Sequence, residues 1–378
     1  MLILAAVLAI FVYGMIAAML GTILPDLSSR FKLTPKQNGA IAFAQALGLI
    51  LASVSVGPLI DNEGKKVGMV LGLALITLAL FLLPRSKGYA SVIANLFLLG
   101  LGGGIIVTAS NALGADISQG HSGTVLNLLN LFFGLGGLAT PFIAAHLLSR
   151  DSVRLCYLTA ALTFVTLVIN IITPMPPPNG AKSFVFSQIG SVLSRPDLWL
   201  FSLFLFFYVA SEVGVWNWLV QHLISQGIAE SSALNVLSLG FALGLLIGRV
   251  AIAPVLITVS GLTVTLCSAI AMLVTTWLML NTRSAKVAWI LVFMAGLSMA
   301  PVFPTTLAVT STVFPAMTGT ALGIVITFGW IGLAVSSRVI GSIAGGDPRR
   351  LKKALLVLPA MAALMIVVNI ALHSFVRG

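Results

Sequence analysis

One acidic side chain, Glu212, lies deep within an apolar stretch of this sequence, in YVASEVGVWNWL (residues 208–219). A charge inside an apolar span is costly, so a residue of this kind is expected to have a function. Burial favours the neutral form of a carboxyl, and a carboxyl that alternates between neutral and charged forms can carry a proton. Glu212 is therefore a candidate for proton coupling. The alternative is a protonated structural acid that is hydrogen-bonded to a neighbouring helix.

Aromatic residues flank Glu212 at helical spacing. Tyr208 lies four residues before it and Trp216 four residues after it, so a helix would present all three on one face. An aromatic ring stacks against the C–H face of a sugar, while acids and amides, such as the neighbouring Asn217, bind its hydroxyls. The pattern favours a sugar site, and the alternative is an aromatic packing stripe.

Uncharged polar side chains also lie inside apolar stretches. They are Asn111, Asn127, Asn130 and Thr305, and Pro304 precedes the threonine and leaves a backbone carbonyl without its usual donor. These groups could bind the hydroxyls of a solute. They could equally form hydrogen bonds between helices.

The composition indicates that most of the chain lies in lipid. Of its 378 residues 59% are hydrophobic and 8% are charged, whereas roughly a quarter are charged in a soluble domain. Helices are expected, because lipid offers the backbone no hydrogen bonds and the alternation of a membrane barrel is absent. The net charge of +11 comes from short loops between apolar stretches. Lipid headgroups or an anionic solute are therefore favoured as partners over nucleic acid.

The apolar stretches predict an all-α integral membrane protein with twelve transmembrane helices in two pseudo-symmetric six-helix bundles. A proline-rich break, TPMPPPNGAK, lies close to the middle of the chain and cannot continue a helix. It gives a bundle at 1–173, a linker at 174–196 and a bundle at 197–378. The predicted spans are 3–25, 37–60, 67–84, 89–112, 122–148, 153–173, 197–224, 231–253, 256–280, 285–312, 317–344 and 352–375.

An internal repeat relates the two halves. GTVLNLLNLFFGLGGLA (123–139) matches GTALGIVITFGWIGLA (319–334), with an offset of 196 that becomes 195 after one gap. Tyr13 and Tyr208 keep the offset of 195, so Tyr13 is also a candidate for solute binding. Paired halves with a site at their interface are typical of transporters. The glycine string GLGGG (100–104) predicts close helix packing rather than a phosphate loop.

The stretch GPLIDNEGKKVGM resembles the loop between helices 2 and 3 of the major facilitator superfamily. The matching residues are Gly57, Leu59, Asp61, Gly64, Lys65 and Lys66, while Asn62 replaces a usual arginine. The resemblance implies a secondary transporter with a latch here that closes the cytoplasmic side, Asp61 facing a helix N-terminus of the other half. A solvated turn is the alternative. Arg249, in LIGRV, is similar to the second-half counterpart of this gate, or it reaches to lipid headgroups.

Four further stretches resemble the fucose–proton permease-like group of sugar symporters. They are VTASNALGADIS (107–118), LNLLNLFFGLGG (126–137), YVASEVGVWNWL (208–219) and PVFPTTLA (301–308). The sequence departs from that group at the acids that carry protons. Val107 stands where helix 4 often has an acid, and helix 1 has none. Proton coupling would therefore use another residue, for which Glu212 is the candidate. The internal repeat aligns Glu212 with Ala17, so the two halves differ at this position.

The resemblance places both termini in the cytoplasm, in the cell (inner) membrane, and implies a functional monomer. The positive-inside rule expects an excess of basic residues on the cytoplasmic side. In this sequence most basic residues fall on the side of the membrane opposite the termini. Three explanations are open: loss of basic residues at the ends of the chain, attraction of an anionic solute, or an organellar membrane. The basic residues on that side are Arg30, Lys32, Lys36, Arg85, Lys87, Arg150, Arg154, Arg283, Lys286, Arg349, Arg350, Lys352 and Lys353.

The sequence therefore predicts a proton-coupled carrier of a small polar solute, such as a sugar. The alternative is an organic-anion or amphiphile/drug carrier of the same superfamily. A membrane enzyme is disfavoured because Asp26 and Asp116 stand isolated, and a non-transporting receptor is disfavoured as well. We expect no metal and no cofactor, because the histidines are scattered and Cys156 and Cys267 read as small buried apolar residues.

Overall fold

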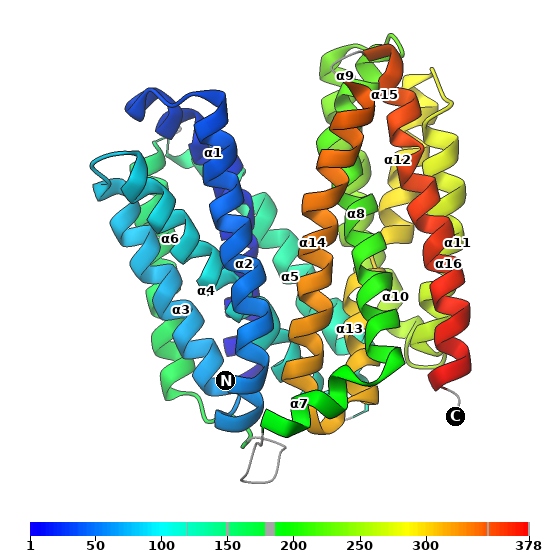
Figure 1. Cartoon of the computed structure of the whole chain (residues 1–378). Helices are drawn as coiled ribbons and strands as arrows, with labels where there is room; N and C mark the ends of the chain where they lie inside the picture. Colours follow the sequence, from blue (N-terminus) through cyan, green and yellow to red (C-terminus); the bar gives the residue numbers. More distant parts are fainter. Residues whose placement is uncertain (119, 149–150, 178–185, 346–347, 377–378) are drawn as a thin grey trace. The chain divides into compact units, whose positions relative to one another are not determined.

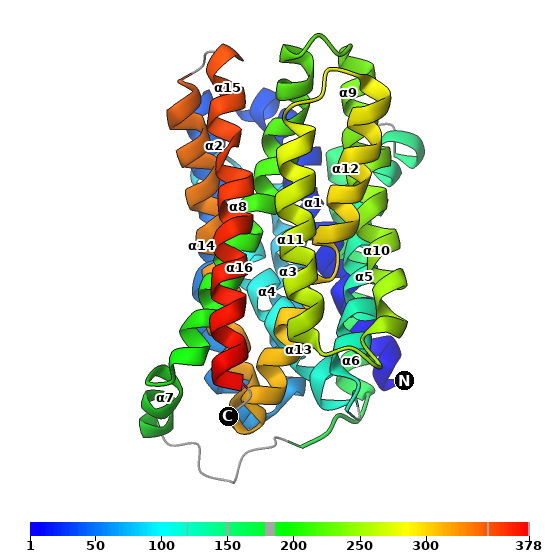
Figure 2. The same ribbon diagram turned by 90° about the vertical axis from the view of Figure 1, so that its right-hand side faces the viewer.

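The structure is a computed structural model that describes residues 1–118, 120–148, 151–177, 186–345 and 348–376 (Figures 1 and 2). Within these residues twelve helices are long and apolar enough to cross a membrane, and no strand is present. The predicted class, an all-α membrane protein with twelve spans, is confirmed. Residues 178–185 of the predicted linker lie outside the described part, and the rest of the linker includes a short helix, α7.

The helices follow one another along the chain with short connections. Their bounds are α1 Leu2–Phe31, α2 Pro35–Glu63, α3 Lys65–Leu82, η1 Leu83–Arg85, α4 Tyr89–Asp116, α5 Ser122–Phe142, η2 Ile143–Leu147, α6 Ser152–Ile172, α7 Phe186–Leu193, α8 Pro196–Ser225, α9 Glu230–Asn235, η3 Val236–Ala242, α10 Leu243–Val255, α11 Gly261–Met279, α12 Ala285–Met299, α13 Val302–Val313, η4 Pro315–Met317, α14 Thr318–Ala344, α15 Pro348–Leu355 and α16 Val357–Val376.

The contacts divide the chain into two compact units. Unit 1 comprises Met1–Ser118, Leu129–Gly190 and Phe314–Thr327, and unit 2 comprises Gln119–Leu128, Ser191–Val313 and Phe328–Gly378. The units therefore follow the predicted halves except at two helix starts, those of α5 and α14. Each of these helix starts makes its contacts with helices from the other half of the sequence.

Glycines allow the helices of unit 1 to approach closely. A Cβ atom at Gly100 of α4 would lie 2.1 Å from the carbonyl oxygen of Gln45 on α2. At Gly104 it would lie 2.5 Å from the carbonyl oxygen of Leu49. Both distances are shorter than any real contact, so only glycine fits. The prediction that the string at 100–104 serves helix packing is confirmed.

In unit 2 the same principle joins η3 and α10 to α12. A Cβ atom at Gly244 would lie 2.4 Å from the carbonyl oxygen of Phe293, and one at Gly296 would lie 2.4 Å from that of Phe241. In the same unit, α11 and α16 run side by side (Figure 2). Asn369 on α16 donates to the Thr265 hydroxyl on α11 over 2.8 Å.

Several spans depart from regular α-helix, among them the span predicted at 122–148, which ends in the π-helix η2. The span predicted at 285–312 consists of α12 and α13, with a break at Ala300 and Pro301. Proline has no N–H to donate and its ring crowds the preceding turn, so the break lies where the sequence allows it. The span predicted at 231–253 contains the π-helix η3 between α9 and α10. π-Helical turns often accompany functional sites.

The glycine contacts predict opposite effects for two alanine substitutions. Gly100→Ala should lower the melting temperature of the detergent-solubilised protein, because overpacking costs about 1–3 kcal/mol. The matched control, Gly21→Ala, meets no atom within 4 Å on α1. It should be neutral or stabilising, because alanine favours helix by about 1 kcal/mol over glycine. Equal shifts in the two variants would contradict the role given to Gly100.

Candidate functional site

The predicted face of Tyr208, Glu212 and Trp216 is present on α8. The helix is unbroken from Pro196 to Ser225, so the three residues follow one another along one side of it. Exposure increases along this face: Tyr208 is completely buried, Glu212 is half-buried and Trp216 is 37% exposed. Asn217 is exposed as well. The face thus runs from a buried phenol to an accessible indole, with the carboxyl between them.

Arg249 on α10 is the cation of this site. Its side chain interacts with Glu212 and Tyr208 and is only 5% exposed. The alternative that it reaches to lipid headgroups is wrong, because that would require an exposed guanidinium. The sequence did not predict that the charge of Arg249 acts on Glu212. A buried guanidinium and a carboxylate stabilise each other, because each alone would be an uncompensated charge. The gate role predicted for Arg249 stays a prediction.

The π-helix η3 holds α8 in place beside this pair. The ring of Trp216 meets that of Phe241 on η3 edge to face, with centroids 5.1 Å apart and an angle of 76° between the planes. Phe241 itself is fully buried. Because η3 continues directly into α10, this contact fixes the start of the helix that carries Arg249. No pattern in the sequence distinguishes the π-helical turn from an ordinary one, so Phe241 was missed.

Two of the candidate amides bind each other inside unit 1. The Asn130 side-chain amide nitrogen donates to the side-chain oxygen (Oδ1) of Asn111 over 2.8 Å. This hydrogen bond joins α5 to α4. The Asn111 amide nitrogen donates to the Val107 carbonyl over 2.7 Å. Both side chains are buried. Tyr13 is also buried, and its ring lies 5.2 Å from that of Phe133 on α5.

The other two polar candidates meet inside unit 2. Asn127 on α5 donates to the Thr305 hydroxyl on α13 over 3.0 Å and to the Gly123 carbonyl over 2.8 Å. Both side chains are fully buried. All four residues thus form hydrogen bonds between helices, which was one of the two interpretations of these side chains. Whether they also bind solute stays a prediction.

Asp61 caps the N-terminus of α14, as the sequence indicated. Its carboxylate accepts hydrogen bonds from the backbone N–H groups of Gly319 (2.8 Å) and Thr320 (2.7 Å) and from the Thr320 hydroxyl (2.7 Å). The positive end of the helix dipole favours a negative charge at this position. Gly57, one turn earlier on α2, has no room for a side chain, because a Cβ atom would lie 2.6 Å from the Gly319 carbonyl oxygen.

Lys65, four residues after Asp61, forms a buried ion pair. Its ammonium lies 2.9 Å from the carboxylate of Asp116 at the end of α4, and the two side chains are 2% and 7% exposed. Asp116 thus has a cationic partner, and among the described residues it belongs to no cluster of acids and histidines of the kind that a membrane enzyme would need. Lys65 also has no access to lipid phosphates, whereas Lys66 is half-buried. Gly64, with φ of 92°, separates α2 from α3 in a conformation that favours glycine.

The internal sequence repeat also relates the contacts made by the starts of α5 and α14. Thr124, 196 residues before Thr320, donates to the carbonyl of Ala253 over 2.8 Å. Ala253 in turn is 196 residues after Gly57. The same offset carries Asp61 to Ile257, so unit 2 has the contact but lacks the acid. The charged latch is thus confined to the start of α14.

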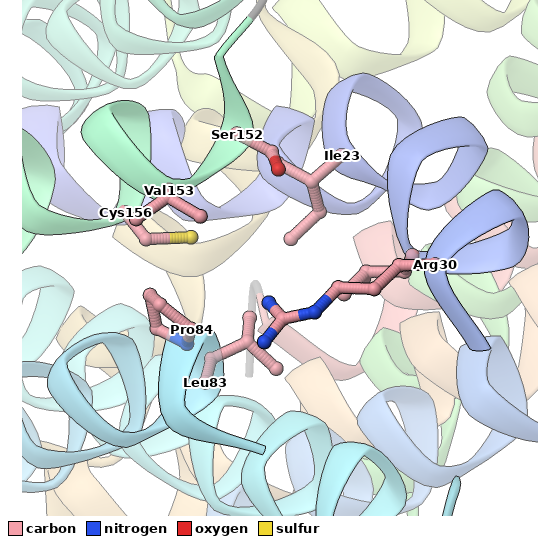
Figure 3. Close-up of a pocket in the computed structure, with 8 residues that line it drawn as sticks. Ile23, Arg30, Leu83, Pro84, Ser152, Val153 and Cys156 are labelled. Carbon is pink, nitrogen blue, oxygen red and sulfur yellow. The ribbon is translucent and has the colours of Figure 1, made fainter. Parts of the chain in front are cut away.

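A small hollow in unit 1 lies where α1, η1 and the start of α6 meet (Figure 3). Arg30 and apolar side chains line it, along with Cys156 and Ser152, whose hydroxyl donates to Asp26. It contains none of the predicted site residues. Cys156 is buried as expected, but Cys267 is exposed, so its predicted burial is wrong. In the described part of the chain no three His, Cys, Asp or Glu side chains gather as metal ligands would.

Comparisons with known proteins agree with this fold. The Major Facilitator Superfamily profile matches residues 6–337, so the chain belongs to that superfamily. The crystal structure of FucP in the outward conformation, a fucose:proton symporter, has a TM-score of 0.86 at 20% identity, and 98% of each chain is covered. The predicted resemblance to that group is therefore confirmed in the fold.

Curated relatives include sugar transporters. The glucose/galactose transporter of Brucella abortus (strain 2308) is 28% identical over 262 residues, which cover 64% of this chain and 63% of that protein. The glucose/mannose transporter GlcP of Bacillus subtilis (strain 168) is 24% identical over 350 residues, covering 88% and 85%. The chain spans 55% to 63% of the length of several curated relatives.

The Lys65–Asp116 pair predicts a rescue between two substitutions. Lys65→Met should lower the melting temperature markedly, because it removes the ammonium that pairs with the buried Asp116 carboxylate, and breaking a buried ion pair costs about 3–5 kcal/mol. Lys65→Met combined with Asp116→Leu should recover much of that loss. Thermal melts of the purified single and double variants would measure this coupling. Losses that simply add would show that the pair does not stabilise the fold.

Proposed function

We propose that this protein is a secondary transporter that moves a small polar solute, a sugar, across the membrane together with a proton. The observation that carries the proposal is the face of α8, where a carboxyl lies between two aromatic side chains inside a membrane span. In this proposal Glu212 carries the proton, while Tyr208, Trp216 and Asn217 contact the solute. Tyr13, Asn111, Asn127, Asn130 and Thr305 are the further candidates for solute contacts.

The chemistry of the face suits a sugar. Trp216 is 37% exposed, so part of its ring is open to a solute, and Asn217 is exposed beside it. A sugar presents C–H groups to an aromatic ring and hydroxyls to carboxyls and amides. The transport of glucose and galactose or mannose by two relatives supports the same solute class.

Proton coupling follows from the two states of Glu212. The positive charge of Arg249 acts on the ionised carboxyl of Glu212, whereas the protonated carboxyl carries no charge to balance it. Proton binding therefore changes the electrostatics of the face where the solute would bind. This gives a physical link between the proton and the solute, as coupled transport requires.

Alternating access would use the latch at the start of α14. Asp61 holds the helix N-terminus and Lys65 holds Asp61 and Asp116 together electrostatically. Opening of the cytoplasmic side would break these bonds. Gly57, Gly64 and Lys66 are the other gating residues of the loop motif at 57–66. The proposal includes both termini in the cytoplasm, a cell membrane location and a functional monomer.

An organic-anion carrier is the second candidate. Arg249 is a buried cation within a possible solute site, and a carboxylate would be its natural partner. The basic residues on the side opposite the termini would attract anions to the protein.

Transport by reconstituted protein tests the role of Glu212. In liposomes, Glu212→Gln should abolish uptake of radiolabelled galactose or glucose driven by a proton gradient. Counterflow, which needs no gradient, should persist because alternating access remains. The matched control is Glu230→Gln, an exposed carboxyl at the start of α9, which should leave both activities unchanged.

Two results would contradict the proposal. Gradient-driven uptake that survives Glu212→Gln would remove Glu212 from the coupling. A wild-type protein that moves organic anions but neither sugar would favour the second candidate.

A further inference from the structure

We propose that Arg85 holds the phosphate of an anionic phospholipid, one acyl chain of which lies along the exposed face of α3. Arg85 belongs to η1, at the end of α3 that lies opposite Lys65. The site goes beyond the proposed transport function and does not depend on it. It also gives one residue of the basic side of the protein a specific partner.

The guanidinium of Arg85 is fixed in the corner between two aromatic rings. Its central carbon, Cζ, lies 3.8 Å from the centroid of the Phe81 ring on α3 and 5.0 Å from that of the Tyr157 ring on α6. The two ring centroids are 6.2 Å apart, with an angle of 63° between the planes. The Nη1 group also donates to the Phe81 carbonyl over 2.7 Å. Because the side chain is ordered before a ligand binds, binding costs less conformational entropy.

This ordered cation has no anion beside it in the described part of the chain. Arg85 is exposed, and none of the ion pairs found there includes it. An arginine carries five N–H donors, and the bond to the Phe81 carbonyl uses one of them. The planar fork of a guanidinium matches two oxygens of a phosphate. A phosphate is therefore the ligand group that this position favours.

An apolar face of α3 leads up to Arg85 and points to a lipid rather than a free phosphate. Leu71, Leu78, Phe81 and Leu82 are all exposed. Leu71, Leu78 and Arg85 follow one another at intervals of two helical turns, so they lie on one side of the helix. From Leu71 to Arg85 the chain rises about 20 Å, whereas one half of the hydrocarbon core is about 15 Å thick. The face is therefore long enough for an acyl chain that hangs from a phosphate at Arg85.

The charges nearby favour an anionic lipid over a zwitterionic one. Arg154 lies one turn before Tyr157 on α6, but it pairs with Asp151 over 3.2 Å, so this pair adds no net charge. Lys87, two residues after Arg85, is exposed and adds a positive charge. Phosphatidylcholine would bring a further cation to this region. Phosphatidylglycerol brings only its phosphate charge, so the surface should bind it more tightly.

The small hollow beside η1 is a separate feature. Pro84, the residue before Arg85, lines the hollow together with Arg30, whereas Arg85 does not (Figure 3). Ser152, which also lines the hollow, donates to the carboxylate of Asp26. Because a carboxylate lies beside the hollow, a phosphate is better placed over the rings that hold Arg85.

Lipid titrations of the purified full chain in detergent test the site. The probes are phosphatidylglycerol and phosphatidylcholine with the same acyl chains, and glycerol 3-phosphate as a headgroup without chains. Native mass spectrometry measures the affinity for each lipid, and the rise in melting temperature reports binding to the folded state. Phosphatidylglycerol should bind more tightly than phosphatidylcholine, and glycerol 3-phosphate should give no shift at the same concentration.

Substitutions separate lipid binding from the bond that Arg85 makes at the end of α3. Arg85→Gln should weaken the binding of phosphatidylglycerol about tenfold, because charge-assisted hydrogen bonds to the phosphate are lost. Its melting temperature without lipid reports any loss of the bond to the Phe81 carbonyl. Arg85→Lys keeps the charge without the planar fork and should recover part of the affinity. The matched control, Lys87→Gln, removes the same charge two residues away and should bind the lipid as wild type does.

Three outcomes would overturn the site. Equal losses of affinity in Arg85→Gln and Lys87→Gln would show that the basic surface acts as a whole. Equal binding of the two lipids to the wild-type protein would show that the charge of the headgroup is not recognised. A shift with glycerol 3-phosphate as large as that with phosphatidylglycerol would show a site for free anions. Sugar uptake is measured separately, so each of these results leaves the proposed function standing.

Discussion

The high cost of an unpaired charge away from water governs the polar contacts of this protein. Most of the chain is apolar, so each buried ionic group must find its partner within the protein. Lys65 does so with Asp116, Asp61 with the N-terminus of α14, and Arg249 with Glu212. Each of these contacts joins two different helices, and the one between Asp61 and the start of α14 joins residues more than 250 positions apart in the sequence. They therefore determine where helices of very similar composition can fit together.

The same constraint makes such pairs suitable for a transporter. A buried charge tolerates an exchange of partners but not the loss of one, so a proton, a solute or a helix terminus can compete for the same group. At the start of α14 the competing group is Asp61, and on the face of α8 it is Glu212. The internal repeat sharpens the comparison, because Ala17 and Ile257 occupy the equivalent positions and are apolar. The two halves share a sequence repeat, and at each of these two pairs of equivalent positions only one half carries the acid.

Close helix packing makes these contacts possible. Glycines at Gly57 and Gly100 bring backbones within reach of each other. At Gly57 this approach places the end of α2 against the first turn of α14, where Asp61 can accept three hydrogen bonds. Dispersion between packed helices, rather than exclusion of water, drives association within lipid. The small residues are thus as important to the latch as its charged ones.

The sequence by itself determined the features that depend on local pattern. Apolar length located the twelve spans, and helical spacing put Tyr208, Glu212 and Trp216 on one face. The motif and the repeat indicated Asp61 and its helix terminus.

Only the tertiary structure decided which faces and partners meet: Asp116 with Lys65, Arg249 with Glu212, Phe241 with Trp216, and the exposure of Cys267. The reason is that a helix in lipid is apolar all round. Large apolar side chains such as Phe43 and Ile172 are 64% and 63% exposed, so hydrophobicity does not reveal the inward face. The rotation of each helix, and hence its partners, is set by packing against its neighbours.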